Sequence, residues 1–83
     1  MSGSTESLSS IENRVRSTIE KTFRISNSPE PGYSMGSVPG WDSLGHMELI
    51  MELEKEFGIT LPSYSFAELI NVEAISRIIR ENQ

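Results

Sequence analysis

Apolar residues near the start of the chain recur every three or four positions, at Leu8, Ile11, Val15, Ile19 and Phe23. This period places them on one face of an amphipathic α-helix. The spacing predicts a helix over residues 7–24. Ser9 and Glu12 fit a capping box near its start, and Arg24 fits the last turn, where a cation complements the helix dipole.

A second helical pattern follows Ser43, and Gly58 is a suitable residue to end it. The spacing therefore predicts a helix over 43–57. Six apolar residues share one broad face of this helix: Leu44, Met47, Ile50, Met51, Leu53 and Phe57. We expect the two methionines to belong to the core. The opposite side carries an acidic ladder, which consists of Glu48, Glu52 and Glu56.

The last third of the chain predicts two more helices after a short extended link at 59–62. Ser65 and Glu68 form a second capping-box pattern, which predicts a short helix through Ile70. Asn71 is a good N-cap for a final helix. The inward positions of that helix are Val72, Ile75, Ile78 and Ile79. Because no stretch alternates with period two for long enough to form a strand, the expected fold is all-α.

Residues 26–41 separate the first two helices and contain too many prolines and glycines for regular structure. We expect four apolar residues to anchor this loop to the helices: Tyr33, Met35, Val38 and Trp41. A connection this long in a small domain is commonly functional. The predicted architecture is a small four-helix bundle with a long first loop and a short third helix.

Composition narrows the possible functions. A chain of 83 residues is one domain, for which we expect a flexible N-terminus at 1–7 and a folded unit at 8–83. The net charge of −5 argues against nucleic acid as a partner. With no cysteine and one histidine, we expect no disulfide and no metal site. No apolar run approaches a membrane span and no secretory segment is evident, so a cytoplasmic monomer is expected.

Ser43 stands where the second helix begins, directly after Asp42, which is a good N-cap. A serine in this position is ordinary, and it needs no function. However, the preceding loop should leave its hydroxyl accessible. The free N–H groups and the dipole at a helix N-terminus also favour a phosphate ester.

The acidic ladder of the same helix admits two explanations. Like charges four residues apart cost a few tenths of a kcal/mol per pair on an isolated helix. The ladder is therefore either a solvated polar face or a docking surface for basic partners. A calcium site is a weaker alternative, because three helical glutamates without a supporting loop seldom form an oxygen cage.

Over about residues 8–81 the chain resembles the acyl carrier protein family. The resemblance rests on the helix order and on the segments Asp42-Ser43-Leu44, Met47-Glu48-Leu49, Met51, Leu53-Glu54 and Glu56-Phe57-Gly58-Ile59. It implies that Ser43 Oγ carries 4′-phosphopantetheine, which a phosphopantetheinyl transferase donates from coenzyme A. It also implies that Asp42 engages the transferase and its magnesium, and that Leu44 makes an apolar contact.

The same resemblance extends to partners and cargo. Together with the acidic ladder, it makes Glu48, Glu52, Glu54 and Glu56 candidates for contact with the basic docking surfaces of partner enzymes. Glu54 falls within the apolar arc, which argues against its exposure. The space where a carried chain can tuck would be lined by Met47, Ile50 and Met51. The thiol of the arm would hold the cargo as a thioester, and the chain itself would supply no catalytic residue.

Two departures from the pattern of many fatty-acid carriers fit a specialised carrier as readily as the general fatty-acid carrier. Val38-Pro39-Gly40 precede Trp41, and Gly45 replaces an acid after Leu44. The cargo is then a fatty acid or a lipid or polyketide precursor, passed on to acyltransferases and synthases. An alternative is an amino acid that an adenylating ligase loads.

Two other classes of protein remain as alternatives. His46 follows Ser43 by three residues, so the pair could act as nucleophile and base in an enzyme, although no third group is evident. The chain could also be an interaction domain that carries no prosthetic group.

Overall fold

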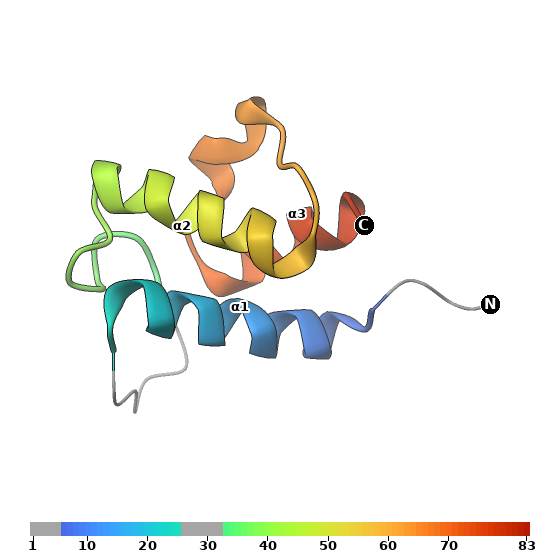
Figure 1. Cartoon of the computed structure of the whole chain (residues 1–83), viewed down its shortest axis with the longest axis horizontal. Coiled ribbons are helices and arrows are strands. Elements are labelled where there is room, and N and C mark those ends of the chain that lie inside the picture. Colours follow the sequence, from blue (N-terminus) through green and yellow to red (C-terminus); the bar gives the residue numbers. More distant parts are fainter. Residues whose placement is uncertain (1–5, 26–32) are drawn as a thin grey trace.

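A computed structural model of the protein describes residues 6–25 and 33–83. Its elements are α1 (Leu8–Phe23), α2 (Ser43–Phe57), the 3₁₀-helix η1 (Ser63–Glu68) and α3 (Val72–Glu81). In Figure 1, α1 and α2 lie side by side and run in opposite directions, while η1 stands on the far side of α2 from α1. The predicted all-α fold with a short third helix is confirmed. The predictions for residues 1–5 and 26–32 fall outside the described residues.

One apolar core joins all the elements. α1 contributes Ile11, Val15 and Ile19, as its spacing predicted. The buried apolar residues of the other segments are Tyr33, Val38, Trp41, Leu49, Ile50, Leu53, Leu61, Leu69, Val72, Ile75 and Ile79. Met35, Phe57 and Ile78 are partly buried against this core. The prediction that the loop is anchored by its apolar side chains is therefore confirmed, because three of the four are buried and the fourth packs against them.

The helix ends confirm three predicted caps. Asp42 accepts a hydrogen bond from the Gly45 backbone N–H at 3.0 Å, and Asn71 accepts one from Ala74 at 2.8 Å. Gly58 ends α2 in the left-handed region with φ 64°, and its N–H donates to the Glu54 carbonyl. These local signals were readable in the sequence because each cap bonds to a backbone group only three or four residues away.

The predicted capping box at the start of α1 is wrong. The N-cap is Ser7, whose hydroxyl accepts a hydrogen bond from the Ser10 N–H at 3.2 Å. Ser9 is an exposed residue inside the first turn. The helix begins at Leu8, one residue before the predicted cap, so the preceding serine is the one that takes this role.

The second predicted capping box is also wrong. η1 begins at Ser63, directly after Pro62, and has no side-chain cap. Ser65 lies within η1, where it is buried and its hydroxyl donates to the Pro62 carbonyl at 2.7 Å. A hydroxyl that donates backwards to a carbonyl closes a tight turn and does not cap a following helix. The helix also ends at Glu68, two residues earlier than predicted.

The predicted apolar face of α2 needs the largest correction. Leu44, Met47 and Met51 are 82%, 47% and 59% exposed. The buried residues of α2 are Gly45, His46, Leu49, Ile50 and Leu53. At about 100° per residue, these five residues form one continuous arc, and the three exposed residues lie together outside it. α2 thus has two apolar faces, of which only one packs on the core.

None of the helices in the described part of the chain is long and apolar enough to cross a membrane.

Candidate functional site at the start of the second helix

The junction between the loop and α2 is held by Asp42. Its side chain caps the Gly45 N–H, and its carbonyl accepts from the His46 N–H at 2.7 Å. Ser43 is the first residue of α2 and is exposed to solvent. Its hydroxyl makes no hydrogen bond to the described residues, and the N–H groups of the first helical positions have no intrahelical acceptor. The helix therefore presents a free hydroxyl beside free backbone donors.

A cluster of three aromatic rings lies beneath this junction. Trp41 is 1% exposed and lies between Phe23 and His46. Its ring centroid is 5.7 Å from that of Phe23, with 17° between the planes, and 6.3 Å from that of His46, with 19°. The prediction that Trp41 anchors the loop is confirmed. The indole N–H is also held inside the molecule, because it donates to His46 Nδ1 at 2.9 Å.

His46 is buried, and both of its ring nitrogens have partners. An indole N–H can only donate, so Nδ1 is the acceptor in the bond from Trp41. A carbonyl oxygen can only accept, so Nε2 carries the hydrogen and donates to the Phe66 carbonyl at 2.8 Å. The neutral ring with hydrogen on Nε2 satisfies both contacts. Neither nitrogen is therefore free to take a proton from Ser43, and the sequence-based pairing of a nucleophile with a base is not formed here.

The four glutamates that were predicted to meet partners differ in their surroundings. Glu56 binds Arg14 Nε at 3.1 Å, and Glu52 is 3.5 Å from Lys55 Nζ. Glu54 accepts a hydrogen bond from the Leu61 N–H at 2.8 Å, which fixes the link that leaves α2. Within the part of the chain that the structure describes, Glu48 is the one member of the four with no hydrogen bond or ion pair.

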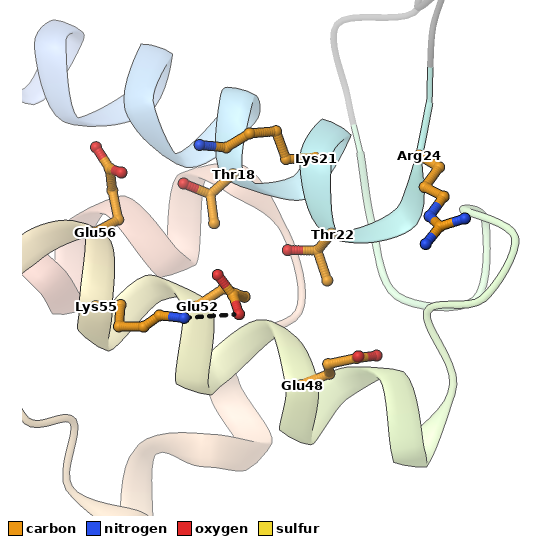
Figure 2. A pocket seen from close by; sticks show the side chains of 8 residues that line it. All are labelled: Thr18, Lys21, Thr22, Arg24, Glu48, Glu52, Lys55 and Glu56. Carbon is orange, nitrogen blue, oxygen red and sulfur yellow. Dashed lines mark ion pairs between the residues drawn. The ribbon is translucent and has the colours of Figure 1, made fainter.

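The acidic ladder faces a groove between α1 and α2 (Figure 2). The groove has a volume of about 520 Å³ and is lined by Thr18, Lys21, Thr22, Arg24, Glu48, Glu52, Lys55 and Glu56. Lys21 and Arg24 come from the C-terminal end of α1, on the far side of the groove from the ladder. These cations offset the repulsion within the ladder, which explains how α2 tolerates it.

The residues predicted to line a cargo space do not come together. Ile50 is buried in the core, while Met47 and Met51 lie on the outer surface of α2 with Leu44. In the described residues, no group of three or more His, Cys, Asp or Glu side chains is placed to hold a metal ion.

Sequence reasoning missed the bond between Trp41 and His46. The two residues lie five apart across a helix start, and no helical or strand periodicity pairs positions at that distance there. The only signal was that each is the single residue of its type in the chain.

Comparison with known proteins agrees with this geometry. The family described as "Phosphopantetheine attachment site" matches residues 40–79, which begin in the loop and include α2, η1 and most of α3. The acyl carrier proteins of Helicobacter pylori (strain ATCC 700392 / 26695) and Helicobacter acinonychis (strain Sheeba) are each 41% identical over 44 residues. Each alignment covers 53% of this chain and 56% of the relative, so the chain spans about half the length of these curated relatives. No solved structure matches the chain.

In its fold and over the matched residues, the chain is thus similar to small helical carrier proteins of the phosphopantetheine-binding class. The curated relatives place the same likeness with acyl carrier proteins, over about half of the chain. The match indicates 4′-phosphopantetheine as a covalently attached prosthetic group. The start of α2 fits such a group, because an exposed hydroxyl, free N–H donors and the positive end of a 15-residue helix lie together.

Proposed function

We propose that the protein is an acyl carrier and that Ser43 Oγ is joined to 4′-phosphopantetheine through a phosphodiester. The observation that carries the proposal is the exposed Ser43 hydroxyl at the first position of α2, beside the 82% exposed Leu44. A modifying enzyme needs free access to the hydroxyl that it alters. Access is open here, because neither residue is covered by the described parts of the chain.

The residues around Ser43 have distinct roles in this proposal. Asp42 fixes the first turn through the Gly45 N–H, so the hydroxyl is held on an ordered helix end. The free N–H groups of that turn stabilise the phosphate charge. When bound, the prosthetic group supplies a thiol that holds the cargo as a thioester. Such a tether raises the cargo's effective concentration at each partner to roughly millimolar.

The outer face of α2 supports docking of enzymes with basic surfaces. Leu44, Met47 and Met51 give it an exposed apolar stripe, and Glu48 adds an exposed carboxylate that makes no ion pair with the described residues. Steering by charge speeds encounters without tight binding, which suits a carrier that has to release its partner. Glu52, Glu54 and Glu56 contribute less, because each already has a partner within the chain.

We propose an acyl cargo, either a fatty acid or a precursor of a specialised lipid or polyketide, carried in the cytoplasm. The partners are then a phosphopantetheinyl transferase, a loading ligase, and downstream acyltransferases or synthases. The chain delivers the substrate, and the enzymes carry out the chemistry. Thioether side chains adapt to irregular apolar shapes, so Met47 and Met51 suit contacts with several partners or with the carried chain.

The proposal is tested by incubating the protein with a broad-specificity phosphopantetheinyl transferase, Mg²⁺ and coenzyme A. Intact-mass spectrometry should show the gain of one phosphopantetheine in the wild type and none in Ser43→Ala. Ser37→Ala is the matched control, since Ser37 is an exposed serine in the neighbouring loop, and it should be modified like the wild type.

Two results would contradict the proposal. One is a wild type that gains no mass with any transferase tried. The other is a Ser43→Ala variant that still gains the group. An unmodified protein that keeps binding a partner after Ser43→Ala would instead identify an interaction domain.

A further inference from the structure

A chain of hydrogen bonds runs through the interior beside the proposed attachment site. The Trp41 indole N–H donates to His46 Nδ1 at 2.9 Å, and His46 Nε2 donates to the Phe66 carbonyl at 2.8 Å. The proposed function uses neither bond. Trp41 belongs to the loop, His46 to α2 and Phe66 to η1, so three separate segments meet at one imidazole ring.

The two hydrogen-bonded rings come from residues on either side of Ser43 in the sequence. Trp41 precedes Ser43 by two residues and His46 follows it by three. Their side chains bond to each other beneath the backbone that connects them, and Asp42 caps the same turn. The chain segments before and after Ser43 are therefore joined by one buried hydrogen bond.

The other bond of the imidazole fixes η1. In the described parts of the chain, the bond from His46 Nε2 to Phe66 is the one hydrogen bond that joins η1 directly to α2. η1 follows Pro62 and has no side-chain cap at its start. η1 carries Tyr64, which is 85% exposed. The imidazole thus sets how the η1 surface lies relative to the start of α2.

We propose that His46 is a positioning residue for the attachment of phosphopantetheine at Ser43. It holds the loop, the first turn of α2 and η1 in one arrangement, which a transferase contacts as a single surface. The inference rests on the proposed function of Ser43 and goes beyond it, because it assigns a role to a side chain that touches neither the hydroxyl nor the solvent. His46 acts by limiting the relative orientations of the loop, the first turn of α2 and η1 in the free carrier.

Three substitutions separate the two bonds from the packing around them. Trp41→Phe keeps an aromatic ring in the stack but removes the N–H donor. His46→Leu removes both hydrogen bonds and keeps an apolar side chain of similar bulk. His46→Gln retains a carbonyl acceptor and an amide donor on one side chain, so it can restore part of both contacts.

The experiment measures KM and kcat for the carrier in the transferase reaction with coenzyme A. Trp41→Phe should raise KM for the carrier about fivefold, the factor expected for one net hydrogen bond. His46→Leu removes both bonds and should raise KM by more than Trp41→Phe does. The kcat should stay close to that of the wild type, because Ser43 and its neighbours are unchanged. His46→Gln should recover most of the loss, which a role in packing alone would not predict.

A control variant distinguishes positioning from general loss of stability. Arg14→Gln breaks the contacts of Arg14 with Glu6 and Glu56 at the far end of α1 and α2, away from Ser43. It should lower stability and leave KM unchanged. A rise in KM for Arg14→Gln equal to that for His46→Leu would overturn the inference.

An NMR measurement reports on the bond directly. The chain has one tryptophan, so its indole N–H gives a single resonance, whose exchange with solvent should be slow in the wild type and faster in His46→Leu. If the wild type is modified and the bond is lost in a folded His46→Leu while KM stays constant, the inference fails and the proposed function stands. A wild type that is never modified defeats the proposed function and the inference with it.

Discussion

Gly40 and Gly45 approach each other so closely that no side chain fits at position 45. A Cβ built on Gly45 would lie 2.0 Å from the Gly40 carbonyl oxygen and 2.9 Å from Cε1 of Phe23. From the sequence, Gly45 only weakens the first turn of α2, by about 1 kcal/mol relative to alanine. The structure gives the reason for the glycine, which is that the loop folds back onto the first turn of the helix.

Gly45→Ala should therefore destabilise the protein, although alanine is the better helix former. We expect a loss of about 2 kcal/mol, because a buried atom forced against backbone cannot be relieved by a rotamer change. Urea denaturation followed by circular dichroism measures the change. A variant more stable than the wild type would show that the loop moves away without cost.

The outer face of α2 should tolerate polar residues. Met47→Gln and Met51→Gln should change the free energy of unfolding by less than about 0.5 kcal/mol, because both residues are exposed on the outer surface of α2. Ile50→Ala, a change in the adjoining buried arc, should cost about 2–5 kcal/mol. Thermal unfolding of the three variants tests whether only the buried face of α2 contributes to stability. Equal losses for all three would mean that the methionines belong to the core.

Two buried serines should respond oppositely to alanine. Ser76 is fully buried in α3 and its hydroxyl has no hydrogen-bond partner among residues 6–25 and 33–83. Ser76→Ala should therefore raise the free energy of unfolding by about 1 kcal/mol. Ser65 donates a hydrogen bond to the Pro62 carbonyl. Ser65→Ala should therefore lower the free energy of unfolding by about 1 kcal/mol. Denaturant titration of both variants gives the comparison. A loss of stability in Ser76→Ala would indicate that its hydroxyl has a partner in solution.

Glu6 should give the stability a dependence on acid pH. The hydrogen bond from the Ser10 hydroxyl, together with Gln83 and Arg14, holds the pKa of Glu6 below its usual value of 4.5. A lowered folded-state pKa contributes stability above pH 4.5, and this contribution is lost as the pH falls through the folded value. The gap in unfolding free energy between wild type and Glu6→Gln should therefore be widest near neutrality and shrink on acidification. A gap that stays constant from pH 7 to about pH 3 would contradict this account.

Much of the fold was determined by local sequence. The period of Ile11, Val15 and Ile19 fixed the buried face of α1, and Asp42 and Asn71 marked the starts of α2 and α3. Such features act over one or two turns of helix, so their physical basis is present in the sequence itself. The position of Ser43 at the start of α2 also followed from the sequence.

Only the tertiary structure decided which apolar residues of α2 are buried and which stay exposed. The apolar residues of α2 exceed what one face can bury, and only packing against α1 and the loop selected Leu49 and Leu53 over Met47 and Met51. In the same packing, the acidic ladder faces Lys21 and Arg24 across the groove. His46 bonds to both Trp41 and Phe66. These contacts join segments whose separation along the chain carries no periodic signal. They form only when all the elements pack into one core, so no single stretch of sequence predicts them.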